Sequence, residues 1–252
     1  MLTFKHSGRM GDVFYSLYYC KNIAHGEPFS LVLRTGVSAW DPSNRPHMME
    51  RADAEFMRPL LELQPYIRRI RIADRSEEVP RDCVNLDSFR EHFYTVCRRE
   101  IRLWYYPSGT NPLDEFERPV LSAPDPPPRI GRFAICFTPR YRECFDVGIL
   151  KPFRDELVFV GLPSEHEAFC KRHFPVEYHP VADALELLRF MQSSRGFIGN
   201  VSGTFSIAEC AKIPRILCME KNGGSVRVYG GGREARTASE LETFFNEIRS
   251  NT

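Results

Sequence analysis

Strand and helix patterns alternate along the 252-residue chain on both sides of a proline-rich segment, and this predicts an α/β protein with two Rossmann-like domains facing each other across a cleft. Short apolar runs suit buried parallel strands, and amphipathic stretches between them suit covering helices. Residues 124–128 contain four prolines, which neither a helix nor a central strand accommodates, so we expect a stiff linker there. The predicted domains are residues 1–124 and 129–252.

The first of these halves begins with a short strand, a glycine-containing turn and a helix. Val13, Leu17 and Cys20 recur at helical spacing and give that helix an apolar side. A later helix is expected to stop before Pro65, because the residue before a proline disfavours the helical conformation. We therefore expect strands at 2–6, 29–33, 67–72 and 83–86, and helices at 12–23, 54–63 and 88–98.

The second half repeats this alternation. Ser164 and Glu167 have the spacing of a capping box, which predicts a helix beginning at residue 163. The glycines at 230–232 predict a flexible loop before the last helix. We expect strands at 133–137, 157–160, 176–179, 196–199 and 215–219, and helices at 163–174, 182–193, 204–211 and 239–248.

Composition and charge argue against several classes of protein function. A net charge of +1 argues against bulk electrostatic binding to nucleic acid. No apolar run reaches the roughly 20 residues of a membrane span, and the N-terminus turns polar too soon for a signal peptide. The eight cysteines are scattered and form no Cys-x-x-Cys pair, so we expect a cytoplasmic protein without a metal site or cofactor.

The turn after the first strand is the first candidate site. Gly8 and Gly11 would let the backbone approach a ligand, and the following helix N-terminus favours a negative group. Asp12 is either a general base for an acceptor hydroxyl or a helix cap, and its position fits both roles. The spacing is not Gly-x-Gly-x-x-Gly, which argues against a dinucleotide site.

A second group of polar residues follows the expected strand at 133–137. Thr138, Arg140 and Arg142 could hold a diphosphate, because the guanidinium fork matches phosphate oxygens. A solvated basic loop is the alternative. Further on, Glu220 follows the strand at 215–219, where it could bind ribose hydroxyls or simply lie on the surface.

The third candidate is a turn of small polar residues after the strand at 196–199. It contains Asn200, Ser202, Gly203 and Thr204, and backbone N–H groups at the next helix start would suit a phosphate. Ser206 with Glu209 is an alternative capping box there. The histidines, His6 among them, lack ligand-like spacing and are interpreted as structural or surface residues.

Two of these motifs resemble a known family. Residues 6–13 resemble the opening loop of the lipopolysaccharide heptosyltransferases, which are glycosyltransferase family 9-like proteins of the glycosyltransferase-B (GT-B) superfamily. Residues 199–209, followed by Pro214, resemble the family's donor-binding turn. Val201 and Ser206 stand where that turn commonly has Asp and His.

The resemblance implies an inverting, metal-independent glycosyltransferase with Asp12 as the base. Its expected partners are a nucleotide-sugar donor and a glycan or glycolipid acceptor. The donor is expected to contact Gly8 and Gly11 of the first turn. The other expected donor contacts are Thr138, Arg140, Arg142, Asn200, Ser202, Gly203, Thr204 and Glu220. The alternative is a non-catalytic nucleotide- or carbohydrate-binding module of the same fold, which the two substituted positions favour.

Overall fold

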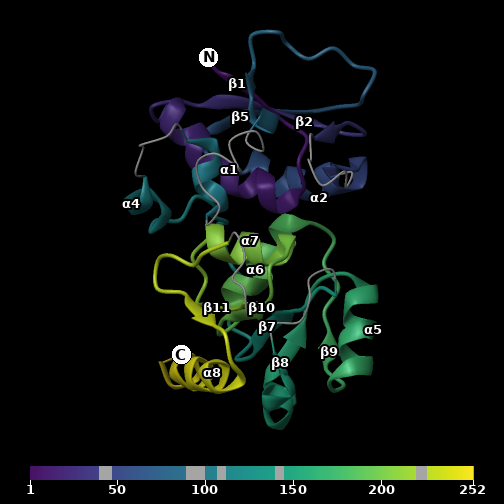
Figure 1. The fold of residues 1–252 in the computed structure, drawn as a ribbon, viewed down its shortest axis with the longest axis vertical. Helices are drawn as coiled ribbons and strands as arrows, with labels where there is room; N and C mark the ends of the chain where they lie inside the picture. The colour runs from purple at the N-terminus through teal and green to yellow at the C-terminus, as the bar shows by residue number, and fades with distance from the viewer. Residues whose placement is uncertain (40–46, 89–99, 107–111, 140–144, 220–225, 252) are drawn as a thin grey trace.

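The computed structural model describes residues 1–39, 47–88, 100–106, 112–139, 145–219 and 226–251. Within these residues the chain forms two parallel sheets, as the alternating pattern predicted, and one short antiparallel pair. Figure 1 shows the N-terminal half above the C-terminal half, with α1 and α7 lying between the two sheets.

The N-terminal half holds a four-stranded parallel sheet in the order β5-β2-β1-β6. Its strands are buried and apolar near the centre, which is what helix cover on a parallel sheet requires. The elements are β1 (Thr3–His6), α1 (Met10–Ile23), β2 (Phe29–Arg34), β3 (Ser38–Ala39), β4 (His47–Met48), α2 (Arg51–Glu62), β5 (Ile67–Ala73), β6 (Val84–Asn85), the 3-10 helices η1 (Leu86–Ser88) and η2 (Ile101–Tyr105), and α4 (Leu113–Phe116).

The C-terminal half holds a six-stranded parallel sheet in the order β12-β11-β10-β7-β8-β9. The strand β12 follows the glycines at 230–232, where the sequence predicted only a loop. The elements are β7 (Phe133–Cys136), η3 (Gly148–Glu156), β8 (Leu157–Phe159), α5 (Pro163–Arg172), β9 (Glu177–Tyr178), α6 (Ala184–Ser193), β10 (Phe197–Gly199), α7 (Gly203–Cys210), β11 (Arg215–Cys218), β12 (Arg233–Ala235) and α8 (Ala238–Asn251).

The capping box of Ser164 and Glu167 is wrong: α5 begins at Pro163, and the Glu165 carboxylate accepts the Leu162 N–H at 3.1 Å. Proline suits the first helical position because the amide it lacks would have no helical partner there. The helix expected at 88–98 falls almost wholly on residues 89–99, which lie outside the described residues.

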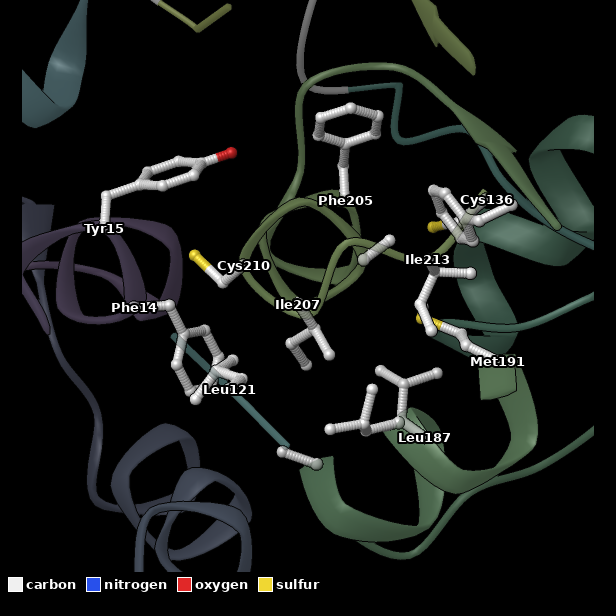
Figure 2. Packing of buried hydrophobic residues seen from close by; sticks show 14 of the residues in the cluster. Phe14, Tyr15, Leu121, Cys136, Leu187, Met191, Phe205, Ile207, Cys210 and Ile213 are labelled. Carbon is white, nitrogen blue, oxygen red and sulfur yellow. The ribbon is translucent and has the colours of Figure 1, made fainter. Parts of the chain in front are cut away.

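The two halves share one hydrophobic core. Helices α1 and α2 pack against α7 and α6, so the contact is made by helices rather than by the sheets themselves. Figure 2 shows Phe14 and Tyr15 of α1 beside Ile207 and Cys210 of α7, with Leu121 packed between. The main chain adds two bonds, because the N–H groups of Val120 and Leu121 both donate to the Cys210 carbonyl, at 2.8 and 3.1 Å.

A buried group of charges also joins the halves, and we call it the Arg102 cluster. The Arg102 guanidinium of η2 lies 2.8 Å from the Glu100 carboxylate and 2.7 Å from that of Glu209 in α7. Glu209 in turn pairs with Arg215 at 2.5 Å and Lys212 at 2.8 Å. Arg102 and Glu209 are both 0% exposed, so these charges depend on one another for neutralisation.

Candidate functional site

The loop after β1 is organised around a buried histidine. The Gly8 N–H donates to Nδ1 of His6 at 2.8 Å, so Nδ1 carries no proton and the ring proton is on Nε2. Nε2 lies 3.1 Å from the Tyr105 hydroxyl, which it therefore donates to. The Tyr105 hydroxyl donates onward to the Asp12 carbonyl at 2.9 Å. We call this series the His6–Tyr105 network; it holds the loop and the first turn of α1 in one arrangement.

Glycine at position 8 is required by that arrangement. A Cβ placed on Gly8 would lie 2.5 Å from Cε1 of His6, closer than real Cβ contacts come. The loop can therefore fold back over the imidazole only because residue 8 has no side chain.

Asp87 supports the same loop from the other side. Its carboxylate accepts the Ser7 N–H at 2.7 Å and lies 3.6 Å from the Lys5 ammonium. It is also 3.8 Å from Nδ1 of His6, a distance that would make an ion pair only with a protonated ring. Because Nδ1 already accepts from Gly8, we assign Lys5 as the ionic partner of Asp87.

Asp12 occupies the third position of α1 and is half-buried. Its Oδ2 accepts the Arg9 N–H at 3.1 Å, which is a cap of the helix N-terminus. The structure thus shows the capping alternative, and the role of general base stays a prediction. The same carboxylate would serve both roles if a substrate hydroxyl reached it.

The turn after β10 is held by two side chains. Asn200 exchanges two hydrogen bonds with Thr138 at the end of the neighbouring strand β7: its Oδ1 accepts the Thr138 N–H at 2.9 Å, and its Nδ2 donates to the Thr138 carbonyl at 2.8 Å. This pair fixes the two strand ends relative to each other.

Ser202 caps α7, because its Oγ accepts the Phe205 N–H at 3.0 Å. The capping box of Ser206 and Glu209 is wrong: the Ser206 hydroxyl donates to the Gly203 carbonyl at 2.5 Å, and Glu209 is buried in the Arg102 cluster. Serine suits the cap position since its short side chain reaches back to the helix amides.

The two predicted loops meet. A Cβ on Gly11 would be 3.8 Å from the Ser206 side chain, and a Cβ on Gly203 would be 2.8 Å from Cε of Met10. The first turn of α1 therefore lies against the first turn of α7, although the two are almost 200 positions apart in the sequence. We call the meeting place of these two turns the candidate site.

The outcome for the predicted site residues is mixed. The structure brings together the loops of Gly8, Gly11 and Asp12, and of Ser202, Gly203 and Thr204, and it places Thr138 and Asn200 at adjoining strand ends. Predictions for Arg140, Arg142 and Glu220 lie outside the described residues.

Sequence reasoning missed two residues that shape the site. His6 was interpreted as structural or surface, and burial with two hydrogen bonds confirms the structural reading but shows that it organises the site loop. Tyr105 lies in an aromatic stretch for which no element was predicted. A buried tyrosine hydroxyl needs a partner, and that need was the one available signal.

The described residues contain no group of three or more His, Cys, Asp or Glu side chains arranged to hold a metal ion. None of their helices is long and apolar enough to cross a membrane.

The molecule is thus an α/β protein with two parallel sheets, whose strand-end turns meet at one place. No model of a known protein family matches the chain, and no curated protein sequence does. Solved structures match it over its whole length, and all are distant in sequence.

One is a family 9 glycosyl transferase from Veillonella parvula DSM 2008, with a TM-score of 0.60, 9% identity, and coverage of 100% of this chain and 97% of that one. Another is the iron-containing dodecameric glycosyltransferase TibC from enterotoxigenic E. coli H10407, with a TM-score of 0.57, 12% identity, and coverage of 100% and 76%. TibC in complex with ADP-D-beta-D-heptose matches equally well, at 0.57 and 12%, with coverage of 99% and 77%. The chain therefore has the fold of glycosyltransferase family 9, as the two motifs predicted.

Proposed function

We propose that this protein transfers a sugar from a nucleoside-diphosphate donor to an acceptor hydroxyl on a glycan or glycolipid. The observation that carries the proposal is the meeting of the α1 and α7 N-termini in a chain with a glycosyltransferase fold. The structural relative TibC has been solved with a nucleotide sugar, which supports the same class of donor here.

In the proposed reaction the donor lies in a cleft between the halves, with its diphosphate at the start of α7. The helix N-terminus presents the N–H groups of its first turn and a partial positive charge, and both favour an anion. As the bond between the anomeric carbon and the diphosphate breaks, negative charge grows on the leaving group, and these groups stabilise it.

Asp12 acts as the general base in this proposal. The acceptor oxygen attacks the anomeric carbon from the side opposite the leaving group and transfers its proton to the Asp12 carboxylate. One displacement inverts the anomeric configuration, and no step requires a metal. The His6–Tyr105 network positions Asp12 through its own main-chain carbonyl.

Asp12→Asn tests this proposal, with Asp53→Asn as a matched control. Asp53 caps α2 from the same third helical position, its carboxylate accepting the Glu50 N–H at 3.2 Å. Both variants weaken a cap, but only Asp12→Asn removes the base. We expect Asp12→Asn to lower sugar transfer by about 10²–10⁴-fold and to leave nucleotide-sugar binding intact.

The measurement is release of nucleoside diphosphate from a panel of nucleotide sugars with candidate acceptor glycans, alongside calorimetric binding. Full transfer by the Asp12→Asn variant, or an equal loss in both variants, would remove Asp12 from the mechanism.

A non-catalytic binding module is the second candidate. One observation favours it: Asp12 and Ser202, polar side chains of the two turns that meet, both accept hydrogen bonds that cap their own helices. Calorimetric binding of a nucleotide sugar without product formation, in the wild-type protein, would identify this function.

A further inference from the structure

A second feature of the N-terminal half is a cavity of about 740 Å³ at the carboxyl ends of β2 and β5. It is lined by Arg34 at the end of β2, Arg71 of β5, and residues 75–81 of the connection to β6. Ligands of parallel α/β sheets bind beyond this edge of the strands.

The cavity is not the candidate site. Strand β2 lies between β5 and β1, and parallel strands are spaced by about 4.8 Å. Met49 separates the two places, since its N–H donates to the Ser7 carbonyl and its carbonyl accepts from Gly36, at 3.3 and 3.1 Å.

The cavity wall carries positive charge that the described residues do not neutralise. Arg71 pairs with Glu77 at 3.0 Å. Arg34, Arg75 and Arg81 have no carboxylate partner among the described residues, and Glu78 is the one other acidic residue of the wall.

The partial burial of Arg34 makes the excess of positive charge in the cavity wall energetically unfavourable. Its side chain is half-buried, one guanidinium nitrogen donates to the Arg75 carbonyl at 3.1 Å, and its buried Nε has no acceptor among the described residues. A buried guanidinium N–H without an acceptor destabilises the fold. An anion in the cavity would restore the balance.

A second cavity in the same molecule provides a contrast. It has a volume of about 310 Å³ and also contains two arginines, Arg132 and Arg154. There each arginine faces a carboxylate, Glu177 at 2.6 Å and Asp155 at 3.7 Å. Unpaired guanidinium groups are therefore a property of the first cavity and not of arginine-containing hollows in this fold.

We propose that the cavity at β2 and β5 binds the phosphate monoester or carboxylate of a sugar ligand; the arginines carry the choice of an anion, and the choice of a sugar rests on the proposed function. The guanidinium fork fits the paired oxygens of both groups. The proposal goes beyond the transfer reaction, because it assigns a second ligand site whose occupation needs neither Asp12 nor α7.

The test is calorimetric titration of the full chain with glucose 6-phosphate, glucuronate, inorganic phosphate and neutral glucose. The test variant is Arg75→Gln with Arg81→Gln; both side chains are exposed, so folding should be preserved. The matched control is Arg132→Gln with Arg154→Gln in the second cavity.

We expect the phosphorylated sugar or the uronate to bind the wild type, and the better of the two identifies the anion. Affinity should fall at least about tenfold in the Arg75/Arg81 variant, roughly one charge-assisted hydrogen bond, and stay unchanged in the control. Tighter binding of inorganic phosphate than of either sugar would reduce the cavity to an inorganic-anion site and overturn the proposal.

The proposal also fails if glucose binds as well as the charged sugars, if no charged probe binds, or if both variants lose affinity equally. Nucleotide-sugar binding measured on the same variants separates this site from the proposed function. It should survive in the Arg75/Arg81 variant, and its absence in the wild type would count against the transferase and not against the cavity.

Discussion

The His6 ring shows how a single tautomer organises the loop that carries Asp12. A main-chain N–H can only donate, so the bond from Gly8 fixes the proton of the imidazole on the far nitrogen. That proton then sets the direction of the Tyr105 hydroxyl, which is left to donate to Asp12. The loop geometry thus depends on a tyrosine that lies 93 positions away in sequence.

Tyr105→Phe should destabilise the protein by about 1–3 kcal/mol, because it removes the buried hydrogen bonds of the Tyr105 hydroxyl with His6 Nε2 and the Asp12 carbonyl. Urea unfolding measures this cost, and amide hydrogen exchange at Gly8 and Val13 should become faster.

Tyr19→Phe is the matched control for that substitution. Tyr19 stacks on Tyr105 at 6.3 Å between ring centroids, and no partner of its hydroxyl is found among the described residues. If the two variants are equally stable, the His6–Tyr105 network does not hold the loop.

At the residue scale the sequence predicted where polar site residues lie, but it did not predict which groups they bind. Asp12 was placed at a helix start with two roles open, and the structure shows one of them. The role of His6 could not be predicted, since its partner Tyr105 is brought to it only by the tertiary fold.

Among the elements, the N-cap of α7 links stability to the candidate site. Ser202 and Asp183 each cap a helix of the C-terminal half, Asp183 by accepting the Leu185 and Glu186 N–H groups at 2.9 Å. Only Ser202 lies where α7 meets α1. Substituting each capping residue in turn therefore distinguishes an effect on helix stability from an effect on ligand binding.

Ser202→Ala and Asp183→Ala should each lower the free energy of unfolding by about 1 kcal/mol, as loss of a cap does. Only Ser202→Ala should also weaken nucleotide-sugar binding in calorimetry, because the α7 amides then lose their fixed orientation. An equal effect of both variants on binding would mean that α7 does not contact the donor.

Elements with strong periodicity could be predicted from the sequence, and those defined by distant contacts could not. The helix of Leu185, Leu188 and Met191 was expected and is α6. The strand β12 was missed, because only pairing with β11 makes a strand of three residues after a glycine run. The caps at 162–165 and 202 were misassigned by two and four positions, since several serines and glutamates there satisfy the same spacing.

For the whole molecule the dominant feature is the Arg102 cluster. The Arg102 guanidinium carbon also lies 4.4 Å from the Tyr229 ring centroid and 4.9 Å from that of Phe116, so aromatic faces enclose it. Burial opposes ionisation of Glu209, but Arg215, Arg102 and Lys212 outweigh it and lower the pKa of that carboxyl. Burial raises the pKa of Glu100 despite the attraction of Arg102.

Glu209→Gln should destabilise the fold by about 3–5 kcal/mol, because the buried Arg215 loses its carboxylate partner and Arg102 keeps Glu100 alone. A carboxyl with a lowered folded pKa stabilises the protein fully above its ordinary pKa of 4.5 and progressively less as the pH falls below that value. Urea unfolding should therefore show the gap between wild type and variant narrowing in acid.

The control for this substitution is Glu177→Gln, which breaks the more exposed pair with Arg132 and should change stability far less. A comparable loss in both variants would mean that the buried position of Glu209 has no special weight. The sequence did not predict this cluster, because the pair of Arg102 with Glu209 that joins its two parts forms only when the two halves pack together.

The Arg102 cluster also limits how the protein can move. Pulling the halves apart would break the buried pair of Arg102 with Glu209, and would leave Arg102 with Glu100 alone and Glu209 with the cations of its own half. Loss of a buried ion pair opposes such a separation. We therefore expect a ligand that enters between α1 and α7 to be admitted by movement of the turns rather than by separation of the two halves.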